Sequence, residues 1–298
     1  MILVTGAAGK TGRAVIQALL ASGVPARALV HRPEQTRIVG ALGVTEVLAG
    51  DLCHADTIQT TVQGARAIYH ICPNIHPDEL DIGKKLITAA RSAGIEHFVY
   101  HSVLHPQVEA MPHHWLKMRV EEQLFKSGLP YTILQPTAYM QNILANWGTI
   151  IENGIYSVPY SLETRLSLVD LEDVAEAAAI VLTEPGHQGA IYELVGVSAM
   201  SQTDIANTLH EQLKRPVAIK VISLEEWERN TRNSGMGEYQ VTTLLKMFNY
   251  YQCYGFAGNP NVLSYLLQKQ PASFTDFVKR IANEQENNVR VGKPKPLV

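Results

Sequence analysis

A glycine-rich turn near the start of the chain has the spacing of a phosphate-binding loop. The stretch Thr5-Gly6-Ala7-Ala8-Gly9-Lys10-Thr11-Gly12 follows a short apolar run and opens a helix-like segment. A side chain at Gly6 would clash in the tight turn, one at Gly9 would keep the backbone from a pyrophosphate, and one at Gly12 would hold the helix off the sheet. We therefore predict a dinucleotide site at this helix N-terminus, which favours anions. Its expected contacts are Gly6, Ala8, Gly9, Lys10, Thr11 and Gly12.

The end of the second predicted strand indicates which dinucleotide binds. An acidic residue about 20 positions beyond the glycines would bond the ribose 2′-hydroxyl of NAD. That place holds His31 and Arg32 instead. Because a guanidinium forms charge-assisted, bidentate hydrogen bonds with a 2′-phosphate, the sequence predicts NADP(H). The alternative is that Arg32 is a solvated surface residue.

Two further strand ends supply candidate cofactor contacts. Asp51, with Leu52 beside it, follows the third predicted strand and could accept a hydrogen bond from the adenine amino group. A turn or helix-cap role for this aspartate is the alternative. Cys72 and Pro73 follow the fourth strand. Because doubly wound sheets bind ligands at the carboxyl ends of their strands, these two residues should border the ribose and nicotinamide.

The first half of the chain alternates β-rich runs with amphipathic segments, which is typical of βαβ units and a parallel sheet. Helix-like segments such as Asp78–Ser92 and Pro112–Ser127 end at glycines. The fold class expected is therefore α/β, a Rossmann-type doubly wound parallel sheet. The strand candidates are Met1–Thr5, Pro25–Val30, Val44–Ala49, Ala67–Cys72, His97–Ser102 and Tyr131–Gln135.

Beyond Pro136 the alternation loosens, and from about Ser198 the chain is expected to be mostly helical, which predicts a smaller C-terminal lobe. We assign residues 1–153 and 166–196 to the NADP(H)-binding domain. Residues 154–165 and 197–285 form the expected substrate or partner lobe. Residues 286–298 mix Asn, Lys and Pro without apolar periodicity and are expected to be a mobile tail.

Composition excludes several classes of protein. The chain has 298 residues, 46% of them hydrophobic, and a formal net charge of −3, so neither nucleic acid nor an anionic membrane is an expected partner. Three widely spaced cysteines suggest no disulfide framework, and we expect a cytoplasmic protein. His97 and His101 would lie about 13 Å apart along a strand, too far for one ion, so no metal is expected.

Several stretches together resemble an atypical short-chain dehydrogenase/reductase of the NmrA-like group, over nearly the whole chain. The glycine turn, Arg32 and the Gly50-Asp51 pair carry part of this resemblance. The more specific part is Lys117-Met118-Arg119-Val120-Glu121-Glu122 followed by Gly128-Leu129-Pro130-Tyr131-Thr132-Ile133-Leu134-Gln135-Pro136. The segments Gly255–Asn261 and Ser273–Phe277 are similar to that family's C-terminal lobe.

The resemblance implies an NADP(H)-binding protein and leaves two functions open. Some relatives are reductases of quinones, of triphenylmethane or azo dyes, or of plant phenolic ethers. Others bind the cofactor without known turnover and act as redox-responsive regulators through a protein partner. We favour an NADPH-dependent reductase that transfers hydride to a small aromatic or quinone-like acceptor held in a cleft between the lobes, with the sensor as the alternative.

The resemblance also implies catalytic positions. The usual Tyr-x-x-x-Lys motif places its lysine at Lys117, where it would hold the nicotinamide ribose, but its tyrosine position is occupied by His113. His113, or else its neighbour His114, could deliver a proton, although a quinone or cationic dye can also take its proton from water. Ser102, at the end of the fifth strand, would polarise a substrate carbonyl. Pro136 and Thr137 resemble the segment that contacts the nicotinamide amide.

Replacing Arg32 tests the choice of cofactor. Because the guanidinium is expected to hold the 2′-phosphate, Arg32→Asp should weaken NADPH binding by roughly tenfold or more and leave NADH binding little changed. Titration of both nucleotides by fluorescence measures the two dissociation constants. Equal losses for NADPH and NADH would contradict the assignment.

Overall fold

The computed structural model describes residues 1–291, with side chains described as far as residue 285. By its internal contacts the chain divides into two compact units. The first comprises Met1–Pro136, Leu171–Leu194 and Tyr265–Leu267. The second comprises Thr137–Asp170, Val195–Ser264 and the chain from Gln268 onward.

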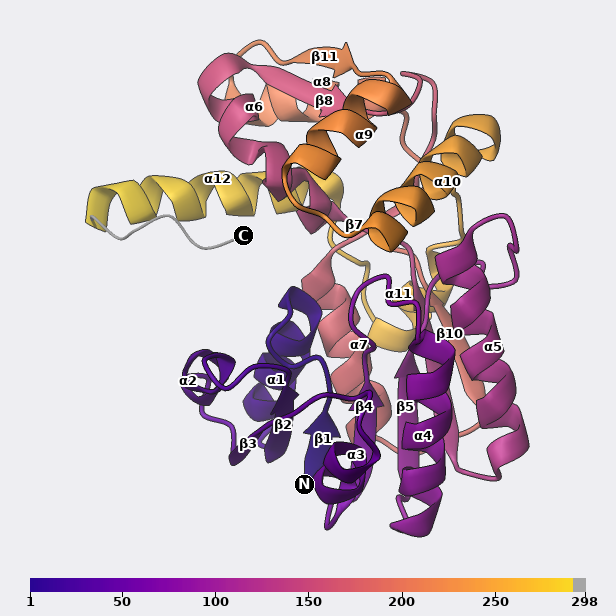
Figure 1. The fold of residues 1–298 in the computed structure, drawn as a ribbon. Coiled ribbons are helices and arrows are strands. Elements are labelled where there is room, and N and C mark those ends of the chain that lie inside the picture. Colours follow the sequence, from indigo (N-terminus) through magenta and orange to yellow (C-terminus); the bar gives the residue numbers. More distant parts are fainter. Residues whose placement is uncertain (292–298) are drawn as a thin grey trace. The chain divides into compact units, whose positions relative to one another are not determined.

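The first unit is built on a seven-stranded sheet in the order β10-β6-β5-β4-β1-β2-β3, in which every pairing is parallel (Figure 1). The order reverses between β1 and β4, which makes this the switch point of a doubly wound sheet. The six predicted strands and the Rossmann-type fold are confirmed; β10 is a seventh strand that the sequence analysis missed. The strands are β1 (Ile2–Val4), β2 (Ala26–Val30), β3 (Glu46–Ala49), β4 (Ala67–His70), β5 (His97–His101), β6 (Tyr131–Pro136) and β10 (Ala190–Leu194).

The helices that cover this sheet form two groups. In one group α1 packs against α7; in the other, α4 packs against both α3 and α5. The apolar face of α1 buries Val15, Ile16 and Leu19. Helix α5 begins with Pro112, whose fixed φ suits a first helical turn, and ends at Gly128 in the left-handed conformation. The helices are α1 (Lys10–Ala21), α2 (Gln35–Gly40), α3 (Ala55–Val62), α4 (Glu79–Ser92), α5 (Pro112–Ser127) and α7 (Leu171–Thr183).

The second unit holds two small parallel sheets and most of the C-terminal helices, as the mostly helical C-terminal region predicts. Strand β7 (Ala138–Tyr139) pairs with β9 (Leu168–Val169), and β8 (Ile155–Val158) pairs with β11 (Ala218–Val221). The remaining elements, of which α11 ends in the first unit, are η1 (Met140–Asn146), α6 (Trp147–Asn153), α8 (Gln202–Leu213), α9 (Leu224–Asn233), α10 (Glu238–Tyr254), α11 (Asn261–Leu267) and α12 (Phe274–Val291). Helix α12 continues through the first six residues of the expected C-terminal tail, and residues 292–298 lie outside the described part.

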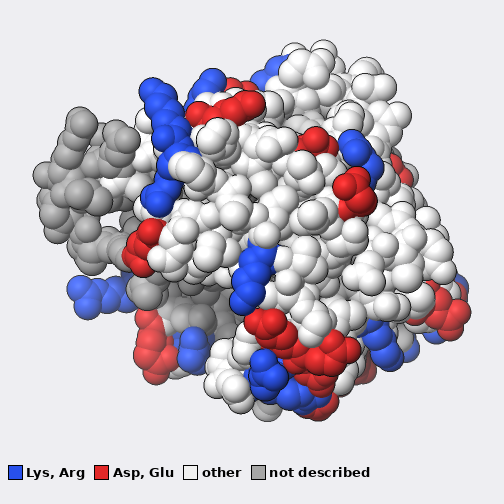
Figure 2. Space-filling model, turned by 90° about the horizontal axis from the view of Figure 1, so that it is seen from above, with Lys and Arg blue, Asp and Glu red and all other residues white. Residues whose placement is uncertain are grey.

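Surface charge on the visible face is mixed. On the face shown in Figure 2, Lys and Arg side chains lie among Asp and Glu instead of gathering into one basic patch. A helix that is long and apolar enough to cross a membrane does not occur among the described residues.

The approach of α4 to α5 depends on a glycine. A Cβ atom added at Gly83 of α4 would lie 2.8 Å from one γ-methyl of Val120 on α5 and 2.9 Å from the other. Val120 is fully buried and β-branched, so its side chain has little freedom to move aside. The close contact between the two helices therefore requires a residue without a side chain at position 83.

Adding a side chain at position 83, against Val120, should destabilise the first unit. In Gly83→Ala, overpacking that costs about 1–3 kcal/mol should exceed the gain of about 1 kcal/mol in helix propensity. The matched control is Gly148→Ala in α6, where an added Cβ meets no heavy atom within 4 Å, so the free energy of unfolding should be unchanged or raised. Urea unfolding measures both, and equal effects in the two variants would contradict the packing argument.

Candidate functional site

The glycine turn between β1 and α1 is as tight as the motif predicts. Gly6 has a positive φ of 59°, and a Cβ there would lie 3.0 Å from the carbonyl oxygen of Ile71. A Cβ at Gly12 would lie 2.4 Å from the carbonyl oxygen of Gly6. Gly12 is therefore needed because the first turn of α1 packs onto the backbone of the glycine turn itself, a closer constraint than the helix–sheet packing that the sequence suggested.

The N-terminus of α1 faces this turn and suits an anion. Gly9 is the N-cap residue, and the first helical turn contains no acidic side chain that would compete with a phosphate. Lys10 and Thr11 open the helix, with Thr11 buried and Lys10 exposed, and Ala8 in the turn is half-buried. The turn is open at Gly9, where an added Cβ would meet only the carbonyl oxygen of Gly6, at 3.3 Å, so the diphosphate of a dinucleotide fits beside this position.

Thr5 joins the carboxyl ends of β1 and β4. Its hydroxyl donates to the carbonyl of Ile71 at 3.0 Å and accepts from the backbone N–H of Ile71 at 2.9 Å. The same oxygen lies 2.9 Å from Nδ1 of His70. Since the hydroxyl proton is used on Ile71, His70 must donate from Nδ1. Burial and the nearby charge of Lys117 lower the pKa of His70 to about 3, so the ring is a neutral imidazole. The hydrogen bonds of Thr5 with Ile71 and His70 therefore hold the end of β4, followed by buried Cys72 and exposed Pro73, beside the glycine turn.

The predicted ribose and adenine contacts lie at the ends of β2 and β3. Arg32 is exposed, and in the described part of the chain its guanidinium has no acidic partner. Asp51 accepts a hydrogen bond from the backbone N–H of Cys53 at 2.8 Å, which lowers the pKa of this carboxyl group. The turn role left open for Asp51 is therefore present, and its second oxygen lies 3.9 Å from His54 Nε2. Leu52 is buried.

A buried ion pair lies at the ends of β4 and β5. Lys117 Nζ donates to Glu79 Oε1 at 2.6 Å and to the carbonyl oxygen of His101 at 3.1 Å. Glu79 is fully buried, Lys117 is 5% exposed, and Tyr100 donates its hydroxyl to the same Glu79 oxygen at 2.9 Å. Because an ammonium group carries three protons, Lys117 keeps one donor beyond these two bonds.

The two histidines at the start of α5 have different surroundings. His113 Nδ1 lies 3.6 Å from Glu79 Oε2, and its side chain is 11% exposed. Burial and the charge of Lys117 hold the pKa of His113 well below its usual value, so the ring is neutral. His114 is fully buried, its Nδ1 lies 3.3 Å from the carbonyl oxygen of His105, and burial lowers its pKa to about 4. His113 is therefore the histidine that adjoins the ion pair.

Ser102 faces a second buried carboxylate. Its hydroxyl donates to Glu121 in a very short hydrogen bond. Gln135 Nε2 lies 3.0 and 3.1 Å from the two oxygens of Glu121, and burial raises the pKa of Glu121. The single proton of Ser102 is thus already used, and polarising a substrate carbonyl would require it to leave Glu121.

The last two predicted contacts lie in different units. The carbonyl of Pro136, at the end of β6, accepts the backbone N–H of Leu104 at 2.8 Å. Thr137 begins the second unit and donates its hydroxyl to the carbonyl of Ser167 at 2.9 Å.

Two functional candidates escaped the sequence analysis, Glu79 and Glu121. Glu79 is an acidic residue in the first turn of a helix, which usually reflects the helix dipole and exposure to water. Glu121 stands inside the stretch that carries the family resemblance, three residues after Met118. A carboxylate on the apolar side of a helix, four residues from a lysine, is the one signal that could have singled it out.

Three side chains beyond β3 and β4 have the spacing of metal ligands. Ligand atoms of Cys53, His76 and Asp78 lie within 4.8 Å of one another, so they could hold a cation. However, His76 Nδ1 accepts the backbone N–H of Asp78 at 3.2 Å, and the Asp78 side chain is 62% exposed. The expected absence of a metal stays a prediction.

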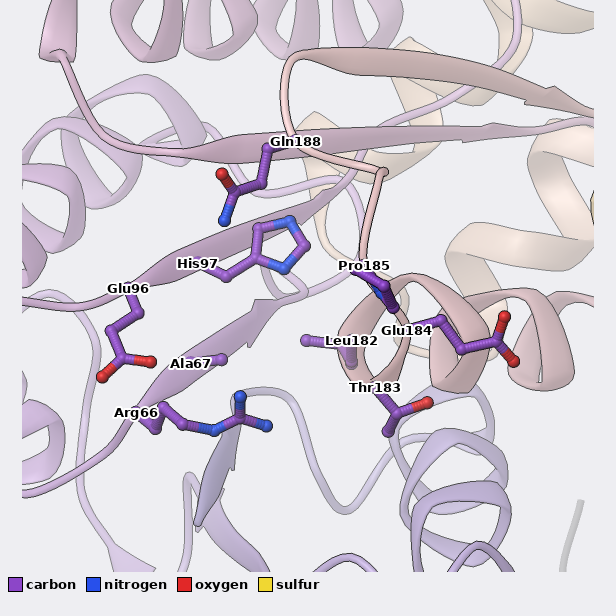
Figure 3. Close-up of a pocket in the computed structure, with 9 residues that line it drawn as sticks. All are labelled: Arg66, Ala67, Glu96, His97, Leu182, Thr183, Glu184, Pro185 and Gln188. Atoms are coloured by element: carbon purple, nitrogen blue, oxygen red, sulfur yellow. The ribbon is translucent and has the colours of Figure 1, made fainter.

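A cavity of about 250 Å³ lies elsewhere on the first unit (Figure 3). Its lining comes from the starts of β4 and β5, the end of α7 and the segment before β10, and it includes exposed Arg66 and Glu96. His97 also lines it and bonds Thr132 Oγ1 at 2.8 Å. Because these are the amino ends of the strands, the cavity is at the sheet edge opposite to the glycine turn and is not the nucleotide site.

A doubly wound parallel sheet whose glycine turn meets a helix N-terminus at the switch point defines a Rossmann-type nucleotide-binding protein. The chain belongs to the NmrA-like family, whose model matches residues 1–277. The resemblance noted in the sequence is thereby confirmed.

Three relatives span nearly the whole chain. The chain is 30% identical over 281 residues to NAD(P)H azoreductase of Xenophilus azovorans, covering 94% of this chain and 97% of the relative. It is similar to a crystal structure of NADPH-dependent quinone oxidoreductase QOR2 from Escherichia coli complexed with NADPH, with a TM-score of 0.82 and 26% identity. The match covers 95% of this chain and 100% of that chain. It is also similar to the crystal structure of Citrobacter sp. triphenylmethane reductase complexed with NADP(H), with a TM-score of 0.81 and 26% identity. This match covers 94% of this chain and 99% of that chain.

The buried neutral histidines predict strong destabilisation in acid. Burial is the main cause that lowers the pKa of His70 and His101 to about 3 and of His114 to about 4, against 6.5 when solvated. Below pH 6.5 the unfolded chain therefore binds protons that the folded chain does not, and stability falls as pH decreases toward 4. Each histidine contributes a slope of roughly 1.4 kcal/mol per pH unit.

Urea unfolding at pH 7, 6 and 5 measures this slope. His70→Asn should reduce the slope of the free energy of unfolding against pH by roughly 1.4 kcal/mol per pH unit, because one titrating group is removed. The control His54→Asn replaces a side chain that is 70% exposed and should leave the slope unchanged. An identical slope in wild type and His70→Asn would show that His70 is not buried as a neutral ring.

Proposed function

We propose that this chain is an NADPH-dependent reductase that transfers hydride to a small aromatic or quinone-like acceptor. The observation that carries the proposal is the buried Lys117–Glu79 pair, placed at the same sheet edge as the glycine turn, with one ammonium donor to spare. The three relatives described above, all reductases by name, support this class of activity.

The chain's own residues fit the parts of NADPH. The glycine turn and the N-terminus of α1 would hold the diphosphate, since the turn is open at Gly9 and the first turn of α1 has no acidic side chain. Arg32 would bind the 2′-phosphate, with Asp51 and Leu52 near the adenine and Cys72 and Pro73 near the ribose. The remaining donor of Lys117 would bind a nicotinamide ribose hydroxyl. NADPH supplies the hydride when bound.

Charge balance favours acceptors that need little acid catalysis. A neutral quinone that takes up hydride becomes an anion and needs one proton, whereas a cationic dye becomes neutral and needs none. His113 is a neutral ring, so it has no imidazolium proton to give, and the proton for a quinone comes from water. The spare N–H of Lys117 is used on the ribose, so only the positive charge of Lys117 would favour a developing oxyanion at the same edge.

The regulator alternative is less well supported. The relatives that support turnover span more than nine-tenths of the chain at 26–30% identity. Tight NADPH binding without turnover would restore the sensor as the better hypothesis.

Oxidation of NADPH followed at 340 nm tests the proposal. The acceptors are a benzoquinone, a naphthoquinone, an azo dye and a cationic triphenylmethane dye, with NADH measured in parallel. We expect turnover with at least one acceptor and a preference for NADPH. Direct titration of NADPH binding accompanies the assay, so that absence of turnover in a protein that binds NADPH counts against the reductase.

Removing Lys117 should affect both rate and stability. Lys117→Met should lower turnover by roughly tenfold or more, the value of one charge-assisted hydrogen bond. It should also cost about 3–5 kcal/mol in the free energy of unfolding, because Glu79 stays buried without its counter-charge. Lys126→Met on the same helix is the control, since that side chain is 63% exposed. An unchanged rate in folded Lys117→Met would remove Lys117 from the site.

A further inference from the structure

We propose that Glu79 is a positioning residue of this site, which keeps Lys117 protonated and holds His113 as the Nδ1–H tautomer. The inference rests on the proposed function and names a residue that the family's lysine motif does not include. Glu79 touches neither substrate nor cofactor in this account. It acts through Lys117 and His113.

The position of Glu79 brings three elements together. It is the first residue of α4, and it faces His113 and Lys117, which lie one turn apart on the same side of α5. Tyr100 reaches the same carboxylate from β5. The contact at Gly83, one turn further along α4, is what lets α5 come this close.

One carboxylate oxygen serves Lys117. Glu79 Oε1 accepts from Lys117 at 2.6 Å and from Tyr100 at 2.9 Å, and Glu79 has no exposed surface. A buried lysine without a nearby negative charge tends to lose its proton. Glu79 is the carboxylate in direct contact with Lys117, so it is the group that opposes this loss. The titratable groups facing Lys117 from all packed elements are Glu79, His70, Cys72, Tyr100, His101, His113, His114 and Glu121.

The other oxygen faces His113. Glu79 Oε2 and His113 Nδ1 are both buried, neither has a hydrogen-bond partner, and they lie 3.6 Å apart. An unprotonated Nδ1 would point its lone pair at a carboxylate, which is unfavourable, so we place the proton on Nδ1. A small decrease in the 3.6 Å distance between Nδ1 and Glu79 Oε2 then gives an ordinary hydrogen bond. The lone pair then lies on Nε2. Nδ1 is buried, so the 11% exposure of the side chain belongs to its other atoms, and with the proton on Nδ1 the Nε2 atom is a hydrogen-bond acceptor.

Such an arrangement is not required for stability alone. Buried ion pairs are often replaced by apolar side chains without loss of stability, whereas removing one partner is strongly destabilising. A role limited to packing would therefore be satisfied by any pair of matched side chains. A positioning role requires the negative charge itself.

The experiment follows the protonation of Lys117 directly, by the ¹³C shift of its Cε atom in [6-¹³C]lysine-labelled protein, assigned with Lys117→Met. In Glu79→Gln the titration midpoint of Lys117 should fall by about one pH unit or more relative to wild type. The rate of NADPH oxidation should then decrease as pH rises through the new midpoint. The control is Asp81→Asn, on the same helix, where the wild-type side chain is 62% exposed. In this variant the titration midpoint of Lys117 and the pH dependence of the rate should match wild type. Equal midpoints in Glu79→Gln and wild type would overturn the proposal.

Two further measurements keep the test decisive. Imidazole ¹⁵N shifts of His113 should show a proton on Nδ1, and a proton on Nε2 instead would overturn the tautomer assignment. If Glu79→Gln fails to fold, Glu79→Gln/Lys117→Met should regain stability, and an equally unfolded double variant would overturn the pairing. The NMR readouts need no turnover. An inactive wild type with the expected midpoint shift would thus count against the reductase and not against the role of Glu79.

Discussion

The ion pair between Lys117 and Glu79 is the interaction on which the candidate site depends. Two opposite charges removed from water are tolerated where they are paired and hydrogen-bonded, and here Tyr100 and the carbonyl of His101 each add a hydrogen bond to the pair. The pair imposes a condition on the fold, because α4 and α5 must pack closely enough for a 2.6 Å contact. Gly83 meets that condition by removing the side chain that would collide with Val120.

The neighbouring strands β1 and β4 are also tied together at this edge of the sheet. Thr5 joins the ends of β1 and β4 through Ile71 and His70, and Gly6 lies against Ile71 on the other side. The glycine turn and the end of β4 are therefore joined at one edge of the sheet, the edge at which the Lys117–Glu79 pair also lies. Its histidines are kept neutral by burial, so fixed dipoles and one ion pair provide the local field instead of mobile protons.

The sequence predicted the elements whose signals are local. Strands in a buried parallel sheet are near-continuous apolar runs, and the helices between them carry an apolar face and a glycine stop, so six strands and α1, α4 and α5 were found. The glycine turn was found because its spacing is set by backbone geometry. Strand β10 was missed because an edge strand is only partly buried, with Ile191 45% exposed, and lacks such a run.

Site residues whose roles arise from tertiary pairing were not predictable in this way. Glu79 lies 38 positions from Lys117, and no periodicity relates them; only the packing of α4 on α5 does. Ser102 was predicted from the family resemblance, which places a hydroxyl at this strand end, but its bond to Glu121 depends on which face of α5 is buried. Asp51 carries a signal that fits both a turn and an adenine contact, and the structure shows the turn.

A crystal structure of the chain with NADPH would show whether Lys117 holds the cofactor, through the distance from Lys117 Nζ to the nicotinamide ribose hydroxyls. We expect a hydrogen bond of about 2.7–3.2 Å between these atoms, with Glu79 still bound to Lys117 and the 2′-phosphate beside Arg32. A structure in which the ribose lies beyond reach of Lys117, or in which the nucleotide binds away from the glycine turn, would contradict it.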